Sequence, residues 1–263
     1  MKKTNIYIIF ICMLIANLIC ITSTIINNKK REKQFEESIL TFSEKNEKTI
    51  YSINKILFFS SSNAKNKTST GSNFTIENLY TYTDISIFIN TNPEEQNLEN
   101  GLKNITIKNI TYKKLPIIGQ PNLYYKSVKD FTSGEIKEEN KIKNELKLEV
   151  VSEKTTDLDK QLLYNNVYPI TLSYINQNIK TDYTMLDISN PITYDGTLLK
   201  KCEIPLNLIT TQIAFEIEIE NIKGHKFETT INFDIPYEND GKSIYDGNIV
   251  VKKELKNNFY RYE

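Results

Sequence analysis

A long uncharged run near the start of the chain most strongly limits what this sequence can form. From Ile6 to Ile26 it contains no Asp, Glu, Lys or Arg. As an α-helix the run is about 31 Å long at 1.5 Å per residue, enough to cross a hydrocarbon core of about 30 Å. We therefore predict an N-terminal transmembrane anchor within residues 1–28, with the membrane as a partner.

The flanking residues favour an uncleaved signal-anchor. A cleaved secretory signal ends in small residues, and residues 22–24 (Thr-Ser-Thr) match that pattern poorly. Lys2 and Lys3 precede the run, and long domains cross the membrane largely regardless of flanking charge. We expect a single-pass protein with an extracytoplasmic C-terminal domain. The basic residues 29–33 leave a cytoplasmic body as the alternative.

Residues 29–59 carry apolar side chains at helical spacing. Steps of four and three place these residues on one helix face, at the a and d positions of a heptad repeat. A single Asn at an a position can fix the register of a two-stranded coiled coil. We predict an amphipathic helical stalk, which either pairs in a homodimer or packs on its own head domain. The seam consists of Phe35, Ile39, Phe42, Asn46, Ile53 and Ile56.

An apolar helix, an amphipathic helix and a β-rich head, in that order, resemble the layout of type IV pilin-like proteins. Those proteins carry a Gly before the apolar stretch and a Glu five residues into it. Here residues 1–5 contain no Gly, and Phe10 and Ile11 occupy the interior. The resemblance covers topology only, and it implies a component of a secretion or pilus-like envelope assembly.

The rest of the chain predicts a polar linker and a β domain. Residues 60–75 are largely polar, whereas residues 76–263 contain short runs in which apolar and polar side chains alternate. Thr211 to Tyr237 predicts a long hairpin that turns at Gly224. Ile105 and Ile107 alternate, but Ile110 and Tyr112 continue with changed parity, which predicts a bulge. The fold class is an all-β sandwich, either jelly-roll-like or immunoglobulin-like.

Composition excludes several classes of function. Lys and Arg number 33, as do Asp and Glu, so the chain lacks the basic footprint of a nucleic-acid binder. With His225 as the single histidine, a two-histidine metal site cannot form. The sequence contains no G-x-S-x-G, G-x-G-x-x-G or P-loop motif. We predict no enzymatic activity and assign no catalytic, metal-binding or cofactor-binding residue.

Two surface features remain as candidate sites. Tyrosine pairs could stack on sugar rings, as carbohydrate-binding sandwiches do, and the relevant residues are Tyr80, Tyr82, Tyr124 and Tyr125. A row of acids, Glu216, Glu218 and Glu220, falls on the outward face of a hairpin strand. We interpret this row as a solubilising face that Lys223 and Lys226 partly neutralise.

These observations favour a membrane-anchored surface protein with a structural or adhesive role. A carbohydrate- or cell-wall-binding module is the first alternative. A component of a secretion or pilus-like assembly is the second.

Overall fold

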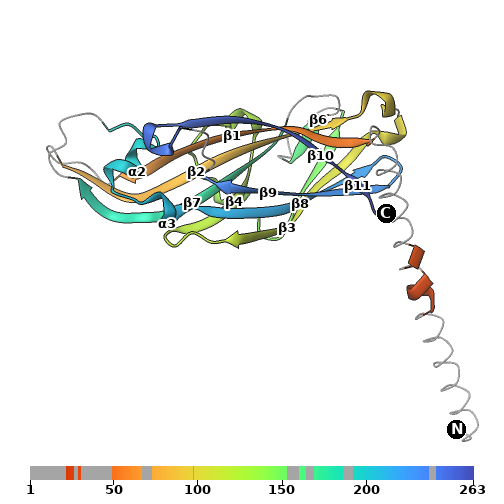
Figure 1. Ribbon diagram of the computed structural model, residues 1–263, viewed down its shortest axis with the longest axis horizontal. Helices are drawn as coiled ribbons and strands as arrows, with labels where there is room; N and C mark the ends of the chain where they lie inside the picture. Colours follow the sequence, from red (N-terminus) through yellow and green to blue (C-terminus); the bar gives the residue numbers. More distant parts are fainter. Residues whose placement is uncertain are drawn as a thin grey trace, which may run out of the picture.

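The computed structural model describes residues 22–26, 29–30, 49–66, 73–96, 98–152, 160–163, 169–185, 192–236 and 241–263. Within them, two β-sheets pack face to face in an elongated sandwich (Figure 1). The predicted all-β sandwich is confirmed at this level.

The first sheet has the strand order β10-β1-β2-β7-β4, and all its neighbours are antiparallel. Its strands are β1 (Tyr51–Asn66), β2 (Phe74–Thr91), β4 (Gln120–Lys126), β7 (Ile170–Met185) and β10 (Ile249–Asn258).

The second sheet has the order β11-β9-β8-β3-β5-β6, in which only the pair β5 and β6 is parallel among the described strands. Its strands are β3 (Leu102–Lys114), β5 (Leu146–Val151), β6 (Gln161–Leu163), β8 (Thr211–Asn221), β9 (Lys226–Ile235) and β11 (Tyr260–Arg261). The described connections include the short helices α2 (Thr197–Lys201), α3 (Leu206–Ile209), η1 (Pro93–Glu95), η2 (Leu98–Asn100) and η5 (Ile244–Asp246).

Aromatic side chains join the two sheets across the core. Phe58 of β1 meets Phe233 of β9 edge to face, with ring centroids 5.2 Å apart, and Phe215 of β8 meets the same ring at 5.8 Å. At the beginning of β1, Tyr51 packs on Phe227 at 5.0 Å. Burial of rings this large supplies much of the driving force that holds the sheets together.

The strongest strand predictions are confirmed. β8 and β9 form the expected hairpin with continuous antiparallel register, and Gly224 in its turn has a φ of +82°. The predicted bulge also occurs, because the pairing of β3 with β8 shifts between Lys108 and Thr111. Asn109 takes a φ of +51° there, which resets the alternation so that Ile107 and Tyr112 both face the core side.

The prediction of a helical stalk over residues 29–59 is wrong at its C-terminal end. Residues from Tyr51 onward form β1, so Ile53 and Ile56 are core residues that are 0% and 1% exposed, not members of a dimer seam. A register shift between Ile53 and Lys55 brings both isoleucines to the inner face although they are three positions apart. The other seam residues, Phe35, Ile39, Phe42 and Asn46, lie outside the described residues.

The predicted linker over residues 60–75 is also wrong where the structure describes it. Residues up to Asn66 continue β1, and β2 begins at Phe74, so the sandwich starts at Tyr51 rather than at residue 76. Ser60 and Ser62 are fully buried because both hydroxyls find partners. Ser60 Oγ lies 2.8 Å from Thr83 Oγ1, and Ser62 Oγ donates to the carbonyl oxygen of Asp195.

Most of the predicted membrane span, Ile6 to Ile26, lies outside the described residues. Residues 22–26 are described and are helical. Among the helices that the structure describes, none is both long enough and apolar enough to span a membrane.

Candidate functional site

Aromatic and polar side chains gather on the outer face of the first sheet. Successive side chains of a strand point to opposite faces, so Tyr80, Tyr82 and Asp84 of β2 share this face. Register places Ser173 of β7 opposite Asp84, and Tyr124 of β4 opposite Ser173. Three strands that are distant in sequence thereby build one continuous surface.

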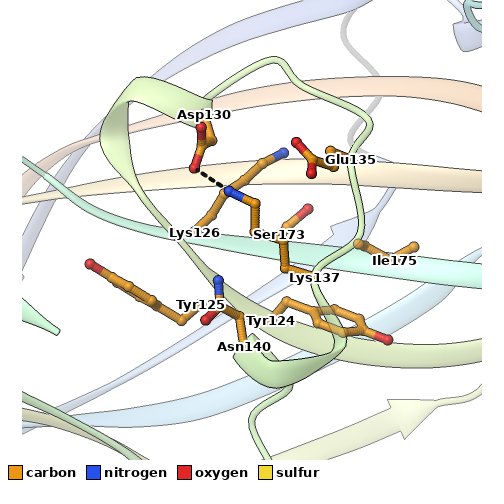
Figure 2. A pocket seen from close by; sticks show the side chains of 9 residues that line it. All are labelled: Tyr124, Tyr125, Lys126, Asp130, Glu135, Lys137, Asn140, Ser173 and Ile175. Carbon is orange, nitrogen blue, oxygen red and sulfur yellow. Dashed lines mark hydrogen bonds and ion pairs between the residues drawn. The ribbon is translucent and has the colours of Figure 1, made fainter. Parts of the chain in front are cut away.

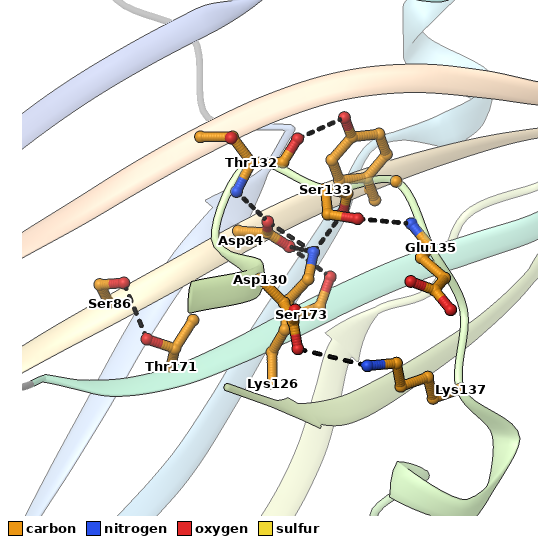
Figure 3. A network of polar contacts seen from close by, with 12 residues as sticks. Asp84, Ser86, Lys126, Asp130, Thr132, Ser133, Glu135, Lys137, Thr171 and Ser173 are labelled. Carbon is orange, nitrogen blue, oxygen red and sulfur yellow. Dashed lines mark hydrogen bonds and ion pairs between the residues drawn. The ribbon is translucent and has the colours of Figure 1, made fainter. Parts of the chain in front are cut away.

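Residues 127–140, which we call the strap, cover this surface (Figure 3). The strap follows β4 and contains the short helices η3 (Val128–Asp130) and η4 (Glu138–Asn140), neither of which has a buried residue. The groups beneath it are nevertheless hidden from solvent, because Asp84 is 0% exposed and Lys126 is 6% exposed. A thin, half-exposed segment therefore seals a charged site.

A buried ion pair lies at the centre of the site. Lys126 Nζ donates to both carboxylate oxygens of Asp84, at 2.7 and 2.6 Å. Asp84 also accepts from Ser173 Oγ at 2.6 Å and from the backbone N–H of Thr132 at 2.8 Å. The third contact of Lys126 Nζ is the carbonyl oxygen of Ser133. Every proton of the ammonium group thus has an acceptor in the protein.

The two charged groups depend on each other and on the strap. Burial raises the pKa of Asp84 and lowers the pKa of Lys126, because loss of water disfavours the charged form of each. The attraction between the two charges, together with hydrogen bonds from Ser173 and Thr132, opposes this effect at Asp84. Such a pair adds little net stability but is costly to break, so we interpret it as a device that fixes the position of the strap.

Two tyrosines of β2 hold the main chain of the strap. Tyr80 Oη donates to the carbonyl oxygen of Gly134 at 2.7 Å, and Tyr82 Oη donates to that of Thr132 at 3.2 Å. Burial raises the pKa of Tyr80 to about 12 and also raises that of Tyr82. Both hydroxyls therefore keep the proton that they donate at neutral pH.

Apolar contacts complete the attachment of the strap. Phe59 of β1 lies 5.9 Å from the ring of Tyr82 and 6.2 Å from the ring of Phe131 in the strap. Ile136 of the strap packs against the same cluster, which also includes Tyr124. These residues form a second, small apolar core on the outside of the sandwich.

A small cavity remains between the strap and the sheet (Figure 2). Its volume is about 20 Å³, which is space for roughly one water molecule. Lys137 Nζ and Asp130 Oδ2, both from the strap, lie 3.4 Å apart beside it. The cavity is lined by Tyr124, Tyr125, Lys126, Asp130, Glu135, Lys137, Asn140, Ser173 and Ile175.

This arrangement holds a chain segment. Ser173 Oγ donates a hydrogen bond to Asp84, and the Lys126 ammonium acts only as a donor. Asp84 and Ser173 are both buried beneath the strap. The site presents donors and an acceptor to a polypeptide backbone.

The predicted stacking tyrosines are brought together only in part. Tyr80, Tyr82 and Tyr124 belong to the outer cluster, whereas Tyr125 points to the core between the sheets. Adjacent residues of a strand cannot share a face, so the Tyr124/Tyr125 pair is split. The four side chains are only 3–9% exposed and offer no open ring face to a sugar while the strap is closed.

The sequence did not identify Asp84, Lys126 or the strap as parts of one site. Asp84 falls on the same face of the strand as Tyr80 and Tyr82. An acidic residue on a strand face is typical of a face that is exposed to solvent. The one available signal was the Tyr-x-Tyr-x-Asp pattern, in which large rings share a face with a charge. Its partner, Lys126, is 42 residues away, so only the strand register could join the two.

The acidic row on β8 is paired mainly with lysines of β3, and the expected partial neutralisation is confirmed for Lys226, which lies opposite Glu220 and whose charge acts on Glu218 and Glu220. Glu220 meets Lys103 at 2.6 Å and Glu218 meets Lys108 at 2.5 Å, both across the β3–β8 pairing. Tyr262 Oη also donates to Glu218 at 2.5 Å. The contact ion pairs of Lys223 and Lys226 are with Glu99 and Glu263, respectively. The row therefore does not form an open acidic surface.

Glu218→Gln is expected to destabilise the protein by about 1 kcal/mol at pH 7, because hydrogen bonds to a charged group are lost. Burial alone would raise the pKa of Glu218, but the bonds from Lys108 and Tyr262 outweigh it and lower the pKa below 4.5. A lowered folded-state pKa means that this stabilisation is present above pH 4.5 and is lost as the pH falls through the folded-state value. Urea unfolding from pH 7 to pH 3 should show the difference from wild type disappearing. Glu254→Gln, at an exposed pair with Lys252, is the control and should not change the unfolding midpoint.

In the part of the chain that the structure describes, no three His, Cys, Asp or Glu side chains are grouped so that they could hold a metal ion. Comparisons with protein-family models, curated proteins and solved structures found no match for this chain. The interpretation of the site therefore depends on its own geometry.

Proposed function

We propose that the protein is a single-pass, membrane-anchored surface protein whose β-sandwich is a non-enzymatic adhesive or structural binding module. The uncharged run from Ile6 to Ile26 supports the anchor, and the basic pair before it supports an extracytoplasmic head. The buried Asp84–Lys126 pair, whose polar atoms are bonded within the protein, favours binding over catalysis.

The observation that carries this proposal is the placement of the chain entry at one end of the sandwich. Tyr51 begins β1, and its hydroxyl donates to the carbonyl oxygen of Asn100 at 2.7 Å. The C-terminal segment lies at the same end, because the N–H of Phe259 donates to the carbonyl oxygen of Tyr51 at 3.1 Å. A preceding anchor would therefore hold the molecule by this end, where the C-terminus also lies (Figure 1).

The far half of the sandwich presents apolar side chains to solvent. β3 leads away from the entry end over 13 residues, which is about 40 Å at 3.3 Å per residue. Directly after it, Leu115 and Ile117 are 59% and 70% exposed. Apolar side chains at the end remote from an anchor are suitably placed for contact with another surface.

Leu115→Ser with Ile117→Ser is expected to lower adhesion at least tenfold without changing stability by more than about 0.5 kcal/mol, because both side chains are exposed. Adhesion is measured as attachment of cells that display the full chain, against cells that lack it. Leu98→Ser with Ile222→Ser is the matched control, since those side chains are 82% and 56% exposed at the entry end. Equal loss in both double variants, or loss in neither, would contradict the proposal.

Two further measurements address the anchor and the alternative function. Protease treatment of intact cells should remove the sandwich if it is extracytoplasmic, and should leave it intact if it faces the cytoplasm. Retention of the full chain on insoluble wall polysaccharide, inhibited by soluble sugar, would favour a carbohydrate-binding module instead.

A further inference from the structure

The strap is held in the way that a binding groove holds a peptide. All four hydrogen bonds from the sheet to residues 132–134 reach main-chain atoms, namely one N–H and three carbonyl oxygens. The donors and the acceptor are side chains of β2 and β4: Tyr80, Tyr82, Asp84 and Lys126. Main-chain hydrogen bonding of this kind provides affinity without specifying the side chains of the bound segment.

A steric feature adds selectivity for glycine at one position. A Cβ atom on Gly134 would lie 2.5 Å from Asn63 Nδ2 and 3.1 Å from Tyr82 Cε1. The Asn63 amide ends a half-buried side chain that can move aside, but Tyr82 Cε1 belongs to a buried ring that would have to shift, so the surface favours glycine at this position. The strap segment held at this face, residues 132–134, accordingly has glycine as its third residue.

The strap itself occupies this site at a cost. Thr132 adopts a φ of +73°, a region that β-branched residues rarely enter. In addition, no residue of η3 or η4 is buried, so the strap covers the site without burying much of itself. Because uncovering the Asp84–Lys126 pair is costly, this strained and half-exposed segment can leave only in exchange for another segment that makes the same main-chain contacts.

We propose that the outer face of β2, β4 and β7 is a binding site for a short glycine-containing peptide segment of a partner protein, and that the strap fills this site until the partner displaces it. This proposal deepens the proposed binding function and rests on it. When the strap leaves, Asp84 and Lys126 exchange its N–H and carbonyl contacts for those of the partner. The rings of Tyr80, Tyr82 and Phe59 then flank the bound segment.

The strap competes as a tethered ligand, so the test must weaken it without altering the sheet. A short tether gives an effective concentration on the order of millimolar, which masks the site in the wild-type protein. Gly134→Val places a branched side chain against Tyr82 and Asn63 and leaves the donors and acceptor intact. If this variant does not fold by circular dichroism, Phe131→Ala with Ile136→Ala removes only the apolar anchors of the strap.

The probe is a fluorescent peptide with the sequence of residues 128–137, and binding is followed by anisotropy with the full chain in mild detergent. We expect the released variant to bind it at least tenfold more tightly than wild type does. A peptide with Val in place of its Gly should bind at least tenfold more weakly. Tyr80→Phe and Tyr82→Phe, made in the released variant, should each weaken binding about fivefold, whereas Tyr112→Phe on β3 should not.

Two results would overturn the proposal. One is equal binding of the Gly and Val peptides. The other is no binding to a folded released variant at about 1 mM peptide, the order of magnitude of the effective concentration that the tether provides. Formation of dimers by the released variant alone, seen by light scattering, would also overturn it in favour of strap exchange between copies. None of these results affects what is expected for the adhesion of cells that display the Leu115 and Ile117 variants, because that measurement does not depend on the strap. A failure of the peptide site is thus distinguishable from a failure of the adhesive function.

Discussion

Asp84→Ala is expected to lower the free energy of unfolding by about 3–5 kcal/mol, because it leaves the Lys126 ammonium buried without its counter-charge. The substitution removes an acceptor of four hydrogen bonds, including the one from the Thr132 N–H. The strap should therefore detach before the sandwich unfolds. Urea unfolding measures the global effect, and trypsin cleavage after the exposed Lys129 measures release of the strap.

Two further variants test whether the loss of stability in Asp84→Ala comes from breaking a buried ion pair or only from changing a residue on the outer face of the strand. Asp84→Leu combined with Lys126→Met removes both charges and should recover most of the lost stability, since apolar pairs often replace buried ion pairs without loss. In this double variant the strap should still be cleaved faster than in wild type, because its main chain has lost two partners. Glu77→Ala, at an exposed position of the same strand, is the control and should stay within about 0.5 kcal/mol of wild type. A loss at Asp84 no larger than that at Glu77 would show that the pair is not buried in solution.

The sequence predicted those parts of the fold in which one face is apolar and the other polar. In β8 and β9 the inner positions are almost all Ile or Phe, so period-two alternation and the Gly224 turn located the hairpin correctly. Even the β3 bulge could be predicted, because one extra residue in a strand changes the parity of its inward positions, as happens between Ile107 and Ile110.

The sequence does not predict β1, because the first part of this strand has the spacing of a helical heptad and the second part has the polar composition of a linker. Because the register shifts after Ile53, the inward residues Ile53 and Ile56 are three positions apart in the sequence. This spacing resembles that of a heptad seam. Farther along, Ser60 and Ser62 occupy inner positions that normally carry apolar residues. Their hydroxyls are satisfied by Thr83 of β2 and by Asp195, two residues before α2, contacts that depend on the tertiary structure and leave no local signal.

The candidate site was predictable only as separate aromatic residues. Tyr80, Tyr82 and Tyr124 were singled out, but their role differs, since they bind the strap instead of facing solvent. Burial of Asp84 on an outward position follows from the strap, and a covering loop cannot be inferred from the periodicity of the strand that it covers.

Phe58→Ala is expected to cost about 3–5 kcal/mol of unfolding free energy, the range for removing a buried aromatic ring from a packed core. The ring is 1% exposed and joins the sheets through its edge-to-face contact with Phe233 of β9. A cavity at this position cannot close easily, because strand pairing fixes the backbone on both sides. The measurement is urea unfolding of the full chain, followed by far-ultraviolet circular dichroism.

Phe59→Ala provides the matched comparison, because the next residue of the strand points to the opposite face. Phe59 packs on Phe131 of the strap and not between the sheets, so its loss should accelerate trypsin cleavage at Lys129. Phe58→Ala should leave that cleavage unchanged under native conditions. If residues 29–59 formed a helical stalk apart from the head, neither substitution would alter the unfolding of the sandwich or the cleavage of the strap. A strand at this position therefore predicts that Phe58→Ala lowers the free energy of unfolding without changing cleavage of the strap, whereas Phe59→Ala accelerates that cleavage. The core lies on one side of the strand and the strap on the other.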